Sequence, residues 1–186
     1  MTWLLVILGV AALVGRLRGG RLKNLAGTHA RAWWLLVIGL AMQTVATYLT
    51  PDRRTLAVGL LLGSYLPILL MVGINRNETG MWIAGIGIMM NFIVISLNGG
   101  MPVLPAAVEI AGGSATAEIA GKHVLLDADT VVPFLGDIIP LPGSVISLGD
   151  VFLAIGLGVF VEERTRRHPR LFSRQARSVS GSAAPR

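Results

Sequence analysis

The sequence predicts an all-α integral membrane protein: a five-helix transmembrane bundle, with an outer re-entrant or interfacial segment before the last span. Three observations lead to this fold class. Of the 186 residues, 53% are hydrophobic and only 14% are charged, whereas soluble domains carry about 25% charged residues. The mean hydropathy is +0.69. Several apolar stretches also approach the length of a membrane span. Because a domain of this size leaves roughly a third of its unfolded-chain surface exposed, much of this apolar surface must face lipid.

Five apolar stretches are expected to be the spans, at about residues 2–15, 32–50, 56–74, 81–97 and 148–162. The three middle stretches are close to the roughly 20 residues that a hydrocarbon core requires. The first and last are shorter, and flanking apolar residues or snorkelling arginines must complete them. In the first stretch the basic residues follow the apolar run, whereas in a signal peptide they precede it. We therefore expect a reversed anchor whose N-terminus lies outside.

The charges of the connecting segments predict the orientation in the membrane. The first and third loops and the C-terminal tail together hold 13 of the 16 basic residues, and the other two connections hold 3. Basic loops resist translocation, so the N-terminus is expected outside and the C-terminus in the cytoplasm. Residues 163–186 are expected to form a disordered basic tail against anionic lipid. The net charge of +6 therefore does not indicate a nucleic-acid partner.

The residue inventory argues against several classes of function. There is no cysteine and there are only three histidines, so no disulfide, thiolate site, metal site or cofactor is expected. No ionisable residue falls in the middle of an expected span. Since transporters of ions and protons need such residues, a small transporter is the third hypothesis for the function.

The outer segment, residues 98–147, is where we expect the function. Its prolines and glycines prevent a continuous helix, so it should re-enter the membrane or lie at the outer interface. The candidate binding residues are Asn91, Asn98, Lys122 and His123. Asn91 and Asn98 are seven positions apart, so they share a helix face that can direct polar groups toward this segment. For Lys122 and His123, a solvated loop pair that contacts Asp127 or Asp129 is favoured over a role in handling protons.

Four strings carry a family resemblance: NGGMPV, KHVLLDADT, PFLGDIIPLPG and ISLGDVFLAIG. They resemble a family of uncharacterised bacterial multi-pass membrane proteins, classified only as a domain of unknown function. The resemblance covers most of the chain up to about residue 161. It implies a location in the cell membrane and no particular activity.

A weaker, partial resemblance links the chain to lipoprotein signal peptidases, which are intramembrane aspartyl proteases. Asn98 and Gly99 are similar to their asparagine-glycine motif, and Asp150 is similar to the aspartate that opens their last span. This resemblance implies a catalytic pair of Asp150 with Asp129, or less naturally Asp137. Two carboxylates that share a proton can activate water. The family's arginine-containing box is missing, however, and no arginine follows any of these aspartates.

Asp150 also has a structural interpretation. Ser147 and Asp150 have the spacing of a capping box, in which the two side chains satisfy backbone N–H groups at the start of the last helix. The leading hypothesis is therefore a membrane scaffold or accessory protein whose outer segment binds a lipid, a peptide or a partner helix. An aspartyl hydrolase at the membrane interface is the second hypothesis.

Overall fold

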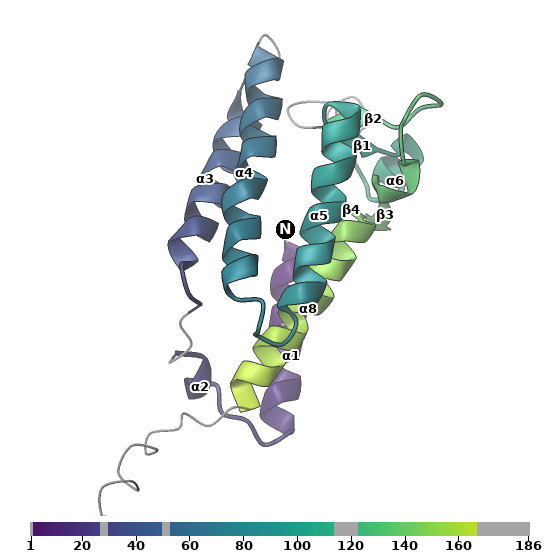
Figure 1. The fold of residues 1–186 in the computed structure, drawn as a ribbon. Helices are drawn as coiled ribbons and strands as arrows, with labels where there is room; N and C mark the ends of the chain where they lie inside the picture. Colours follow the sequence, from purple (N-terminus) through teal and green to yellow (C-terminus); the bar gives the residue numbers. More distant parts are fainter. Residues whose placement is uncertain (1, 27–29, 50–52, 114–122, 167–186) are drawn as a thin grey trace, which may run out of the picture.

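The computed structural model describes residues 2–26, 30–49, 53–113 and 123–166 (Figure 1). Its helices are α1 (Thr2–Leu17), α2 (Lys23–Ala26), α3 (Trp33–Tyr48), α4 (Arg54–Ile74), α5 (Met81–Asn98), α6 (Pro105–Ile110), the 3-10 helix η2 (Pro133–Leu135) and α8 (Leu148–Arg166). Its strands are β1 (Met101–Val103), β2 (His123–Leu125), β3 (Asp137–Leu141) and β4 (Ser144–Ser147). The long helices therefore occupy the five apolar stretches of the sequence.

The long helices form two groups (Figure 1). Helices α3 and α4 pack side by side, and α8 packs against both α1 and α5. Glycines bring α5 and α8 into backbone contact: a Cβ atom at Gly87 would strike the backbone at Gly149, and one at Gly156 would strike that of Ala84. Small residues allow such close approach between helices. These glycines thus serve packing within one chain.

A four-stranded mixed sheet follows α5 and ends where α8 begins. The strand order is β2-β1-β3-β4, with β1 parallel to both β2 and β3 and with β3 antiparallel to β4. Gly99 has a φ of 62°, the left-handed conformation that ends α5 and turns the chain into β1. We call residues 99–147 the cap, of which 114–122 lie outside the described residues.

The expectation of an all-α fold is wrong, because the outer segment contains this sheet. Each strand has only three to five residues, too few to show a clear alternation of apolar and polar positions. Two of the three pairings are parallel and join strands that are distant in the sequence. Local sequence patterns do not reveal such pairings, so the prolines and glycines indicated only an irregular segment.

The expected five-helix transmembrane bundle is not supported either. Within the described part of the chain, only α4 and α5 are long and apolar enough to cross a membrane, judged by length and composition. The apolar part of α1 and all of α3 are shorter, and α8 carries charged residues at both ends. Helix α8 also continues to Arg166, so residues 163–166 are helical. The rest of the expected tail lies outside the described residues.

Three basic segments meet at the end of the molecule that carries the loop between α4 and α5. The backbone N–H of Arg21, after α1, donates to the carbonyl of Thr165 near the end of α8, at 2.9 Å. The Asn75 side chain in the α4–α5 loop bonds the backbone of Arg31 before α3. Arg164 of α8 forms an ion pair with Glu78. We call this the loop end, and the opposite end, which carries the sheet, the cap end.

Candidate functional site

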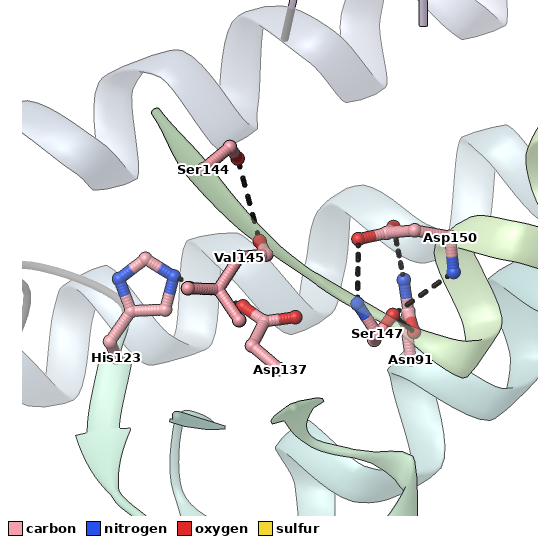
Figure 2. Close-up of polar contacts among 7 residues, drawn as sticks. All are labelled: Asn91, His123, Asp137, Ser144, Val145, Ser147 and Asp150. Atoms are coloured by element: carbon pink, nitrogen blue, oxygen red, sulfur yellow. Dashed lines mark hydrogen bonds and ion pairs between the residues drawn. The ribbon is translucent and has the colours of Figure 1, made fainter. Parts of the chain in front are cut away.

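The most connected polar group joins α5 to the start of α8 (Figure 2). The Asn91 side-chain amide donates to Asp150 Oδ1 at 2.9 Å, and Asn91 Oδ1 accepts from the Ser147 hydroxyl at 2.9 Å. Asn91 and Ser147 are buried, with 8% and 0% of their surface exposed. Because a buried polar group costs free energy unless it is bonded, these contacts fix α5, β4 and α8 relative to one another.

Ser147 and Asp150 also cap α8. The Asp150 backbone N–H donates to Ser147 Oγ at 3.0 Å, and the Ser147 backbone N–H donates to Asp150 Oδ2 at 3.3 Å. These reciprocal bonds are those of a capping box, as the spacing of the two residues predicts. The carboxylate also lies in the first turn of α8, where the helix dipole favours negative charge. Every contact that the structure gives Asp150 therefore has a structural use.

Asp137 lies close to this network on the neighbouring strand. It begins β3 and is in register with Ser147 of β4, and it is buried, with 7% of its surface exposed. Its Oδ2 is 3.5 Å from Nε2 of His123, which reaches it from β2 (Figure 2). We call these five residues, Asn91, His123, Asp137, Ser147 and Asp150, the polar cluster.

Asn98 has a different position, at the end of α5. Its Nδ2 donates to the carbonyls of Val94 and Val131, at 2.8 and 2.9 Å, and its Oδ1 accepts from the N–H of Val131 at 2.8 Å. The side chain thus pairs with the Val131 backbone as a neighbouring strand would. Asn91 and Asn98 both bond the segment after α5, as expected from their shared helix face, and both bonds are structural.

Asp129 is exposed, in a turn before η2. Its backbone N–H donates to Asp127 Oδ1 at 3.0 Å, and that oxygen also accepts from the Thr130 hydroxyl. An aspartate that bonds the backbone two residues ahead is a common turn device. Across the described ranges, no hydrogen bond or ion pair joins the Asp129 side chain to the polar cluster. The cluster therefore contains Asp150 and Asp137, and Asp129 lies apart; Lys122 lies outside the described residues.

Sequence reasoning overlooked the role of Asn75. This residue follows α4, is buried, and bonds the backbone of Met71 and of Arg31. An asparagine directly after an apolar helix suggests a cap, but the contact with Arg31 is 44 residues distant. No pattern in the sequence marks this contact.

In the described ranges, no group of three or more His, Asp or Glu side chains converges in a way that could hold a metal ion.

Comparison with known families gives one match. A family model described as a family of unknown function, DUF5317, matches residues 28–162. The chain belongs to this family. The DUF5317 region includes the whole polar cluster, and the resemblance to an uncharacterised family is confirmed. Neither the curated proteins nor the solved structures contained a match. The biochemical role of DUF5317 proteins must therefore be argued from the structure.

Proposed function

We propose that this DUF5317 protein is a multi-pass protein of the bacterial cytoplasmic membrane that acts as a scaffold or accessory protein. Helices α4 and α5 cross the bilayer, the cap lies outside, and the loop end lies in the cytoplasm. The cap presents a binding surface for a lipid, a peptide or a partner helix. The observation that carries the proposal is the distribution of exposed apolar and aromatic side chains along the helices.

Apolar side chains cover the outward faces of the helices. Helix α4 has 21 residues, which gives a length of about 31 Å, close to the thickness of a hydrocarbon core. The most exposed large aliphatic residues of α3, α4 and α5 are Val37, Val45, Leu56, Leu66, Leu70, Ile86 and Leu97. Soluble proteins rarely expose a contiguous apolar surface of this extent. These exposed apolar side chains are therefore expected to face lipid.

Aromatic residues mark both ends of this apolar surface. Trp33, Trp34 and Trp82 are exposed at the loop end, where α3 and α5 begin. Tyr48 is exposed at the cap end, where α3 finishes. Tryptophan and tyrosine prefer the interface between lipid and water. The two aromatic levels therefore support a bilayer that lies between the ends of the molecule.

The charges support the orientation. The basic segments around Arg21, Arg31 and Arg164 gather at the loop end, whereas Arg53 and Arg54 are the described basic residues at the cap end. Since basic residues accumulate on the cytoplasmic side, the loop end is the cytoplasmic one. The cap then faces outward.

The polar cluster supports a scaffold more than a hydrolase. Asp150 is bonded by Asn91 and Ser147, and Asp137 faces His123. The contacts of Asp150 join the end of the cap to α5 and α8, and the contact of Asp137 with His123 joins β3 to β2 within the cap. The cap itself exposes apolar side chains to its surroundings, with 74% of Ile110 and 61% of Phe134 accessible. Rigid attachment combined with exposed apolar residues is typical of a binding surface.

A photo-crosslinking experiment tests the scaffold. A photoreactive residue at Phe134 in the full-length protein, in intact cells, should give one reproducible protein adduct, because this position lies on the exposed cap. The same residue at Leu66 is the control, since that side chain points outward from the middle of α4 and should meet lipid. The same set of crosslinked products from position 134 and from position 66 would contradict a binding surface on the cap.

One observation favours the hydrolase hypothesis. Asp137 is in register with Ser147, and this pairing brings a second carboxylate beside the start of α8. If the pair is catalytic, Asp137→Asn and Asp150→Asn must each abolish processing of a membrane-bound substrate without unfolding the protein. A scaffold predicts that Asp137→Asn leaves the Phe134 adduct in place. The two outcomes separate the hypotheses.

A further inference from the structure

The loop end carries basic side chains with and without acidic partners. Those with partners are Arg18 and Arg166, which both contact Glu162, and Arg164, which contacts Glu78. Arg21, Arg31 and Arg76 are exposed, and none of them forms an ion pair with a residue of the described ranges. Their guanidinium groups are thus available for an external anion. Two of them, Arg31 and Arg76, lie next to Asn75.

Asn75 fixes the backbone positions of these two arginines. Its Oδ1 accepts from the N–H of Arg31 at 2.9 Å, and its Nδ2 donates to the carbonyl of Arg31 at 2.8 Å. Arg76 is the next residue after Asn75. Only backbone atoms of Arg31 take part in these bonds. The backbone segments of Arg31 and Arg76 therefore lie against each other, while both side chains remain exposed.

The neighbouring tryptophans indicate the depth of this pair in a bilayer. Trp33 and Trp34 lie two and three positions after Arg31, and Trp82 is the second residue of α5, the next helix after Arg76. All three side chains are more than half exposed. Tryptophan side chains are enriched at the level of the lipid headgroups. Arg31 and Arg76 would then lie at the level of the lipid phosphates.

Resting on the proposed membrane location, we infer that Arg31 and Arg76 form a binding site for the phosphate of an anionic phospholipid in the cytoplasmic leaflet. A guanidinium group can donate two parallel hydrogen bonds to a phosphate, which suits it better than an ammonium group. The other basic residues of the loop end add a positive potential that attracts the anionic leaflet. Charge complementarity thus selects an anionic lipid over a zwitterionic one.

The test compares two lipids and two double variants of the full-length protein. In a neutral detergent, phosphatidylglycerol should bind and thermally stabilise the wild-type protein more strongly than phosphatidylcholine. In the variant with Arg31→Gln and Arg76→Gln, this preference should fall roughly tenfold or more. The fold should persist, because the bonds between Asn75 and Arg31 use only backbone atoms of Arg31. The control variant carries Arg53→Gln and Arg54→Gln, which remove the same charge at the cap end and should keep the preference.

Two results would overturn the inference. One is a wild-type protein that binds both lipids equally. The other is an equal loss of preference in both double variants, which would indicate a general charge effect without a site. Extraction of membranes with alkaline carbonate separates this inference from the proposed function. If the Arg31 and Arg76 variant stays in the membrane pellet, the membrane location stands whatever the lipid preference.

Discussion

The side-chain amide of Asn91 lies between two groups at the start of the last helix. It donates to the Asp150 carboxylate and accepts from the Ser147 hydroxyl, each at 2.9 Å. One side chain of α5 thus holds both members of the capping box of α8. The same position also faces Gly149, whose missing Cβ leaves room for the amide. Helix packing and polar bonding therefore coincide at Asn91.

Replacing Asn91 tests this connection. Asn91→Leu should lower the free energy of unfolding by about 1–3 kcal/mol, because buried groups of Ser147 and Asp150 lose partners. Thermal unfolding in detergent measures the change. Gln43→Leu is the control, since Gln43 of α3 makes no side-chain hydrogen bond with a residue of the described ranges. Equal effects of the two substitutions would contradict a specific role for Asn91.

Asp150→Asn should also lower stability, by about 1–2 kcal/mol, because it weakens the capping box and removes the negative charge from the first turn of α8. The retained amide oxygen can still accept from Asn91, so the loss should be smaller than for Asp150→Ala. Thermal unfolding of both variants gives the order. An unchanged melting temperature for Asp150→Ala would show that the start of α8 does not depend on the capping box.

The glycine contacts between α5 and α8 predict a sharp contrast. Gly87→Ala should destabilise the protein by about 1–3 kcal/mol, since the added Cβ would meet the backbone of α8 at Gly149. Gly59→Ala is the matched control on α4, where a Cβ meets nothing within 4 Å. It should be neutral or slightly stabilising, because alanine favours a helix. Chemical unfolding of the two variants in detergent measures both effects, and equal destabilisation would argue against the observed packing.

The Asn98 contact predicts local protection from hydrogen exchange. Asn98→Ala should speed exchange of the Val131 N–H by roughly an order of magnitude, the equivalent of losing about 1.4 kcal/mol of local stability. Ser96→Ala is the control, because among the described residues the Ser96 hydroxyl bonds only the carbonyl of Phe92 in its own helix. Mass-spectrometric exchange on peptides that contain Val131 makes the comparison. Unchanged exchange in Asn98→Ala would contradict the contact.

The sequence predicted well what depends on local pattern. Apolar stretches gave the positions of the long helices, and the spacing of Ser147 and Asp150 predicted the capping box, because both features involve residues within a few positions of one another. The shared face of Asn91 and Asn98 followed in the same way from helix geometry.

Features that depend on distant contacts were missed. The sheet joins Met101 with His123 and Val103 with Asp137, and no periodicity within a three-residue strand reveals such partners. The contact of Asn75 with Arg31 and that of His123 with Asp137 arise only after the helices and strands have packed. The number of spans was overestimated, because a short apolar helix and a membrane span have similar compositions.

Single-cysteine labelling tests most directly the proposal that this is a membrane protein whose cap lies outside. The chain has no cysteine, so Asp129→Cys and Asn77→Cys, both at exposed positions, each give one reactive thiol. We predict that an impermeant maleimide labels position 129 in intact cells and labels position 77 only after the cells are opened. The reverse pattern would contradict the orientation. Labelling of neither position until the cells are opened would contradict exposure of the cap outside the membrane.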